Sequence, residues 1–298
     1  MRPWHFCGTS VAPVAHPVRI GVQSKGGGNA RRRRRGSAGP AARFAATGAG
    51  NECRMLTVRR GKEIFEQDGG WFQARWHFSF DQYHDPAHMG VGALRVFNDD
   101  RIVAGAEWPM HPHRDIESLT YVVEGHFEHA DSAGNDGRLG PGAAQVMDFS
   151  HAGALHSERN ASDTEPMRFI QFWILPSDPV LPTRVQQRQY AGTDRAGRWL
   201  QIMGPPGEDG LDLAQDARVL VSRLGAGGVL SHRLGEGRGS YLYMIDGTGQ
   251  VDDREVGSGD AASLEGPHDL AVSARADTEL ILVDVPLRFR LTGVWARG

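Results

Sequence analysis

The chain has 298 residues and a mass of 32.5 kDa, of which 40% are hydrophobic and 23% charged. This composition is typical of a folded protein, and it excludes a disordered chain, a coiled coil and a collagen-like repeat. No stretch approaches the roughly 18 consecutive apolar residues of a membrane-spanning helix, which excludes a transmembrane protein. The 39 glycines and 16 prolines favour many short strands joined by tight turns.

Residues 1–54 differ in charge from the rest of the chain. They carry ten basic residues and one acidic residue, a net charge of +9, so the other 244 residues carry −12 (−3 minus +9). They include five consecutive arginines, Arg31–Arg35, and no apolar periodicity. We therefore expect a disordered leader that is extraneous to the natural protein, which would start at Met55. A transit peptide and nucleic-acid contact through the arginines remain alternatives for this leader.

The acidic body that follows argues against a nucleic-acid groove there, because phosphate binding needs a basic face. Both cysteines, Cys7 and Cys53, lie in the leader. The body therefore has no thiol for a disulfide framework or for a cysteine-based zinc site.

From Met55 onward, short strand-like segments alternate with turn residues. The segment 94–97 runs into the turn residues 98–100, and the β-branched and aromatic segment 120–123 ends at an acid–glycine pair. Residues 168–174 form a nearly continuous apolar run of the length of a buried strand. Segments at this spacing predict a β-sandwich or a small barrel.

The second half of the body resembles the first. Residues 121–125 (YVVEG) match residues 243–247 (YMIDG) at an offset of 122, and residues 140–146 match residues 257–264 at an offset of 117. The repeat predicts two barrels in tandem. The predicted division is a leader at 1–54, a first domain at 55–192 and a second domain at 193–298.

Two pairs of side chains in the first half point to a metal site. His111 and His113 are two residues apart, and so are His156 and Glu158. Alternate residues of a strand share one face, so each pair should point to the same side. If the two strands are neighbours, three imidazoles and one carboxylate converge, a set that suits a divalent first-row metal.

These motifs resemble the cupin signatures: Gly105-x5-His111-x-His113-x3-Glu117 is similar to the first, and Gly153-x2-His156-x3-Asn160 to the end of the second. More narrowly, the chain resembles the pirin family. The segments that carry this resemblance are 76–80, 89–100, 111–117, 120–125, 128–135, 155–158 and 171–174.

The resemblance implies an all-β bicupin, two tandem double-stranded β-helix (jelly-roll) barrels, with one metal in the first barrel. The implied ligands are His111, His113, His156 and Glu158. The implied metal is Fe(2+), with Ni, Co, Mn, Cu or Zn as alternatives. The second barrel should hold no metal, because it offers only the single histidines His232 and His268 at the matching places.

Two glutamates compete for the fourth ligand position. Most cupins use the glutamate of the first motif, here Glu117, whereas the pirin pattern uses Glu158. We expect Glu158 to be the ligand, and Glu117 to support a ligand histidine or to be a salt-bridged barrel residue.

The resemblance also implies an activity, since many bacterial pirins resemble quercetin 2,3-dioxygenases, which open flavonols with O₂ and release carbon monoxide. Glu158 would be the catalytic base that takes the proton of the flavonol hydroxyl. Candidates for the substrate pocket wall are Phe78, Phe80, Met89 and Trp173, although core packing explains them equally well.

A non-catalytic metal or redox sensor that regulates a protein partner is the alternative function, because it would use the same four ligands. We expect an enzyme with a small aromatic substrate and O₂ as its partners, in the cytoplasm, not at a membrane, and as a monomer.

Overall fold

The computed structural model describes residues 56–178 and 180–297. Within these ranges the chain forms 22 β-strands and three 3-10 helices, and no α-helix. None of the described helices is long and apolar enough to cross a membrane. The predicted leader, residues 1–54, lies outside the described residues.

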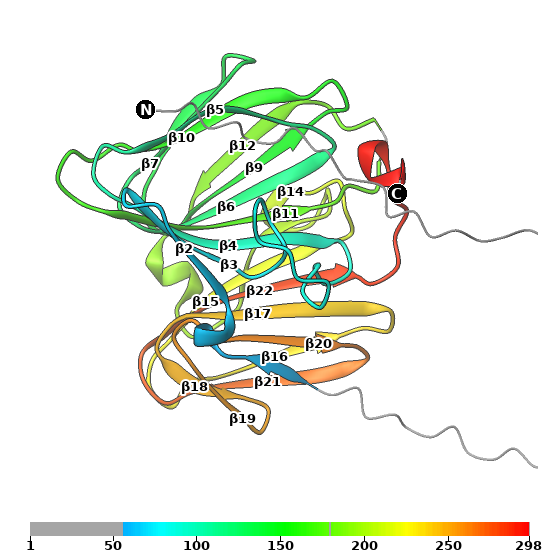
Figure 1. Ribbon diagram of the computed structural model, residues 1–298. Coiled ribbons are helices and arrows are strands. Elements are labelled where there is room, and N and C mark those ends of the chain that lie inside the picture. Colours follow the sequence, from blue (N-terminus) through cyan, green and yellow to red (C-terminus); the bar gives the residue numbers. More distant parts are fainter. Residues whose placement is uncertain (1–55, 179, 298) are drawn as a thin grey trace, which may run out of the picture. The chain divides into compact units, whose positions relative to one another are not determined.

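The first barrel consists of two antiparallel sheets (Figure 1). The order of the seven-stranded sheet is β12 (Arg184–Gln189), β9 (Ala143–Phe149), β6 (Ile116–Glu124), β11 (Met167–Ile174), β4 (Leu94–Ile102), β3 (Phe72–Trp76) and β2 (Phe65–Asp68). The order of the four-stranded sheet is β5 (Glu107–His113), β10 (Ala154–Asn160), β7 (Phe127–Asp131) and β8 (Asp136–Leu139).

The second barrel repeats this plan with one sheet of seven strands and one of four. The order of the larger sheet is β1 (Thr57–Arg59), β20 (Ala261–Glu265), β17 (Arg238–Asp246), β22 (Thr278–Pro286), β15 (Arg218–Leu224), β13 (Leu200–Gly204) and β14 (Leu211–Asp212). The order of the smaller sheet is β16 (Val229–Leu234), β21 (His268–Ala274), β18 (Thr248–Val251) and β19 (Arg254–Gly257). The predicted all-β fold of two cupin-type barrels is therefore confirmed.

The repeated acid–glycine pairs lie at equivalent turns of the two barrels. Gly125 follows β6 with φ +79°, and Gly247 follows β17 with φ +99°. A Cβ at Gly125 would lie 2.6 Å from the Pro166 carbonyl oxygen, and one at Gly247 would lie 2.4 Å from that of Asp277. Glycine is needed at both turns because the backbone is left-handed and a neighbouring chain passes close by.

Each end of the described chain contacts the barrel that the opposite half of the chain forms. β1 pairs with β20, so the first described strand lies in the sheet of the second barrel. The three 3-10 helices are η1 (Gly61–Glu63), η2 (Gly192–Arg195) and η3 (Gly293–Arg297). η3 returns to the first barrel, where the indole N–H of Trp295 donates to the Asp115 carbonyl at 2.9 Å. The predicted boundary at 192/193 falls in η2, between β12 and β13, and the division into domains 55–192 and 193–298 stays a prediction.

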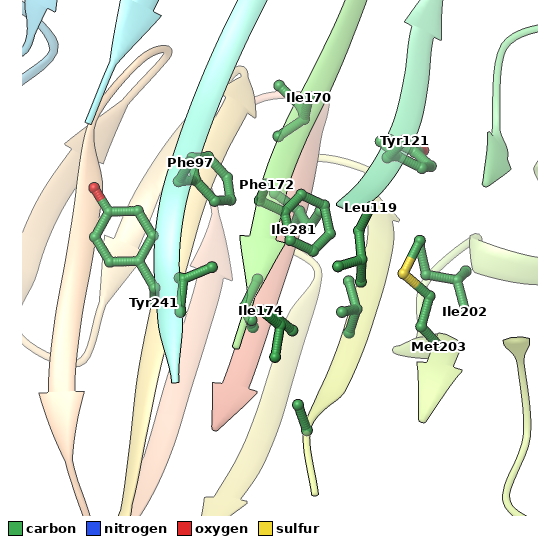
Figure 2. Packing of buried hydrophobic residues seen from close by; sticks show 14 of the residues in the cluster. Phe97, Leu119, Tyr121, Ile170, Phe172, Ile174, Ile202, Met203, Tyr241 and Ile281 are labelled. Atoms are coloured by element: carbon green, nitrogen blue, oxygen red, sulfur yellow. The ribbon is translucent and has the colours of Figure 1, made fainter. Parts of the chain in front are cut away.

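The largest hydrophobic cluster joins the larger sheets of both barrels (Figure 2). Alternation along the strands divides the side chains between this cluster and the interior of the first barrel. On β11, Phe172 belongs to the shared cluster, whereas Phe169 and Trp173 belong to the interior. Because both faces of β11 are covered, its sequence is apolar apart from Arg168 and Gln171, which agrees with the nearly continuous apolar run predicted at 168–174.

A buried ionic network also links the barrels. The Arg168 guanidinium donates to both Asp99 oxygens at 2.9 and 2.7 Å, and the Tyr243 hydroxyl donates to Asp99 at 2.5 Å. Burial alone would raise the pKa of Asp99, but the hydrogen bonds and charge of Arg168 hold it below its usual value. A carboxylate that is paired and hydrogen-bonded in this way can be buried without losing its charge.

Candidate metal centre

The two predicted histidine strands are neighbours. β5 and β10 pair antiparallel, and His111 is the direct partner of His156 in their register. His113 lies two residues along β5 and so on the same face as His111. The register therefore brings His156 to His111 and His113, which lie 45 and 43 residues earlier in the chain.

The three histidines form a compact cluster. One ligand nitrogen from each of His111, His113 and His156 lies within 4.8 Å of the other two. The ring centroids are separated by 4.8 Å for His111 and His113, 4.5 Å for His111 and His156, and 5.0 Å for His113 and His156. We refer to these three residues as the histidine triad.

The protonation of the triad suits metal binding. The Nδ1–H of His111 donates to the Pro109 carbonyl at 2.9 Å, which leaves Nε2 of that ring as the ligand atom. Burial, followed by repulsion from neighbouring histidines, lowers the pKa values of His113 and His156 well below their usual range. Both nitrogens of His156 are buried and have no hydrogen-bond partner within the described ranges. A neutral imidazole with an unpartnered nitrogen, such as His156, is what a divalent metal requires.

Glu158 lies beside the triad. Its Oε1 is 3.4 Å from His156 Nε2 and its Oε2 is 3.9 Å from His111 Nε2. The side chain is 3% exposed, and a register shift between His156 and Glu158 interrupts the pairing of β10 with β5. The Gln171 amide, on β11 of the other sheet, donates to Oε1 at 2.6 Å. Glu158 is therefore fixed across the barrel, and its coordination of a metal stays a prediction.

Glu117 is bound to a loop of the second barrel. Its two carboxylate oxygens accept hydrogen bonds from the backbone N–H groups of Ala214 and Gln215, at 2.6 and 3.1 Å. Burial, together with the neighbouring Asp148 carboxylate, raises the pKa of Glu117 to about 8. These contacts give Glu117 a structural function between the barrels, and its support of a ligand histidine stays a prediction.

The four predicted wall residues lie in different surroundings. Trp173 packs edge-on against His113 at 4.8 Å between ring centroids, and Phe80 packs against Trp173 at 5.3 Å. Phe78 is buried in the core shared by the barrels, against Tyr241. Met89 is 41% exposed. Trp173 is thus the candidate in contact with the triad, and a substrate-binding function for all four stays a prediction.

The structure adds three residues that the sequence analysis did not assign to the site. Phe149 packs against His113 and His156, each at 5.1 Å between centroids. Gln171 binds Glu158, and His129 lies 5.7 Å from His156 between ring centroids. Gln171 could have been noticed as the uncharged polar residue of a mostly apolar strand. His129 could have been noticed as one of three alternate inward residues of β7.

The two single histidines of the second barrel have carboxylate partners. His232 Nε2 lies 2.9 Å from Asp284 Oδ2, and His268 Nε2 lies 2.8 Å from Asp252 Oδ2. These are pairwise contacts on different strands, and the absence of a second metal stays a prediction.

Comparisons with known proteins agree with this geometry. Residues 58–174 match the sequence model of the family described as Pirin, and residues 201–285 match the one described as the quercetinase C-terminal cupin domain. A relative from Zymomonas mobilis, named a putative quercetin 2,3-dioxygenase, is 38% identical over 77% of this chain and 97% of its own. The quercetin 2,3-dioxygenase of Escherichia coli K12 is 34% identical, over 78% of this chain and 99% of its own.

Solved structures show the same likeness. The crystal structure of YhhW from Escherichia coli superposes with a TM-score of 0.74 at 31% identity, covering 79% of this chain and 100% of that one. A second structure, of the bacterial pirin YhhW in complex with nickel(II), superposes with a TM-score of 0.73 at 32% identity, covering 78% and 99%.

Proposed function

Since the chain belongs to the pirin family, we propose that it is a metal-dependent dioxygenase that opens flavonols such as quercetin with O₂. The observation that carries the proposal is the convergence of the histidine triad within 4.8 Å, with Glu158 beside it. The names of the relatives support the reaction, and the nickel(II) complex of YhhW supports the binding of a divalent metal.

The donor set fits such a metal. Three imidazole nitrogens and one carboxylate suit divalent iron, nickel, cobalt or manganese, and the described residues contain no cysteine. One of the two unpartnered nitrogens of His156 gains a partner if it binds a cation. We propose His111, His113, His156 and Glu158 as ligands, and Fe(2+) as the native ion.

When bound, the metal would supply Lewis-acid polarisation of the flavonol oxygens. The protein's own contribution is proton transfer and orientation. Glu158 takes the proton of the substrate hydroxyl on Oε2, while Gln171 holds Oε1 in place through its 2.6 Å hydrogen bond. Trp173 and Phe149 pack against the triad and exclude water from that side.

The test combines metal analysis with oxygen uptake. Protein purified without chelators or metal affinity resin should contain one metal ion per chain, and it should consume O₂ when quercetin is added. His156→Ala should lose both the metal and the O₂ uptake, whereas His126→Ala, at an exposed position of the same barrel, should lose neither.

A protein that binds one metal but consumes no O₂ with quercetin or other flavonols would refute the dioxygenase and favour the sensor. The cytoplasmic location and the monomeric state remain predictions, and size-exclusion chromatography with light scattering measures the second.

A further inference from the structure

A buried histidine on β7 lies next to the candidate ligands and has no part in the mechanism above. His129 is fully buried, and in the register of β7 and β10 it lies directly opposite Glu158. Burial along β7 alternates, with Phe127, His129 and Asp131 buried. His129 therefore points into the barrel on the same side as the triad.

The Nδ1 atom of His129 is bound by a chain of two amides. Gln145, on β9 of the opposite sheet, donates from Nε2 to this Nδ1 at 3.3 Å. Gln145 Oε1 in turn accepts a hydrogen bond from Gln187 Nε2, on β12, at 2.7 Å. A ring nitrogen that accepts a hydrogen bond carries no proton, so the proton of the neutral imidazole is on Nε2.

The His129 ring lies beside the triad, with its centroid 5.7 Å from that of His156. Along β7, His129 lies opposite Glu158 and Asp131 lies opposite His156. Nε2 is 3.7 Å from an oxygen of Asp131, the register partner of His156, so this nitrogen lies on the side of the ring near His156.

That donor has no acceptor in the described protein. A separation of 3.7 Å is too long for a hydrogen bond, and Nε2 has no hydrogen-bond partner among residues 56–178 and 180–297. Asp131 already accepts hydrogen bonds from the backbone of Ala133 and Asn135 and from the Asn135 amide. A buried donor without a partner destabilises a fold, and an oxygen atom of a bound ligand would supply the missing acceptor.

We propose that His129 is a ligand-binding residue of the metal centre, and that its Nε2–H donates a hydrogen bond to an oxygen atom of the molecule bound at the triad. The inference rests on the proposed function, since it needs an oxygen ligand beside the metal. A deprotonated hydroxyl oxygen is the preferred acceptor, because hydrogen bonds to charged oxygens are shorter and stronger. His129 then favours hydroxy-carbonyl ligands over ligands that bind through nitrogen.

Two probes of the nickel-loaded protein test this without turnover. Maltol, a 3-hydroxy-4-pyranone, presents an ionised hydroxyl and a carbonyl, whereas imidazole binds through nitrogen. His129→Met, which has similar bulk and no N–H, should weaken maltol binding by about 10- to 100-fold, as expected for a hydrogen bond to a charged group. It should leave nickel stoichiometry and imidazole binding unchanged.

Two further variants separate the hydrogen bond from general damage. His129→Gln keeps an N–H near the position of Nε2 and should recover part of the maltol affinity. His126→Met, at an exposed position beside the same strand, should bind both probes like the wild type. Equal maltol affinity in His129→Met and the wild type overturns the inference, and so does a parallel loss of maltol and imidazole binding.

The tautomer gives an independent measurement. In zinc-loaded, ¹⁵N-labelled protein, the histidine ring spectrum should show the His129 proton on Nε2 and not on Nδ1, and the opposite result overturns the inference. Failure of the wild type to bind maltol at all would refute the proposed oxygen-ligand site and this inference together. Normal wild-type binding with no effect of His129→Met refutes this inference alone.

Discussion

Replacing Glu158 by glutamine tests the assignment of the base. Gln171 donates to Glu158 Oε1 at 2.6 Å, so the carbonyl oxygen of the new amide should keep that bond. The NH₂ group then takes the position of Oε2, which lies 3.9 Å from His111 Nε2. The site loses its negative charge and its proton acceptor together. We expect kcat to fall by about 10²- to 10⁴-fold, the usual effect of losing a general base, or about 3–5 kcal/mol of barrier height.

The assay is O₂ uptake with quercetin, with metal content measured on the same samples. Some metal should remain bound, because the histidine triad is intact. Glu117→Gln is the matched control, since Glu117 binds the backbone of Ala214 and Gln215. It should keep nearly all of its metal and lose at most about 10- to 100-fold in activity. If Glu117→Gln removes the metal while Glu158→Gln keeps normal turnover, the ligand assignment is wrong and the commoner cupin set replaces it.

Four other outcomes are expected. A protein that starts at Met55 should fold and bind metal like the full chain, and a melting temperature lower by ten degrees or more would contradict this. Elemental analysis should find one metal ion per chain, both in the wild type and in His232→Ala. A wild-type value near two metal ions per chain that falls in His232→Ala would place a metal in the second barrel. Phe97→Ala, at a fully buried position between the barrels, should lower the free energy of unfolding in urea by about 3–5 kcal/mol, and a loss below 1 kcal/mol would refute its place in the core. Folding raises the pKa of Glu117 from 4.5 to about 8, so between these pH values the folded protein holds a proton that the unfolded chain has lost. The free energy of unfolding should therefore fall as the pH rises from 4.5 to 8, and Glu117→Gln should flatten that fall.

The sequence alone determined the features that depend on local spacing. Two pairs of ligand-type residues at i and i+2 predicted that each pair shares a strand face, and the apolar run 168–174 predicted a strand covered on both sides. The matching acid–glycine pairs predicted a duplicated barrel, and they lie at equivalent turns with positive φ. These predictions succeeded because side-chain alternation and left-handed turns are properties of a few consecutive residues.

The tertiary structure decided which strands are neighbours and in what register. The pairing of His111 with His156 joins residues 45 positions apart, and only that register converts two separate pairs into one cluster. Other long-range contacts are set in the same way. Gln171 of the opposite sheet binds Glu158, and His129 lies beside His156. Glu117 binds a loop of the second barrel. β1 joins the second barrel for the same reason: strand pairing is set by contacts between distant segments, which local spacing does not encode.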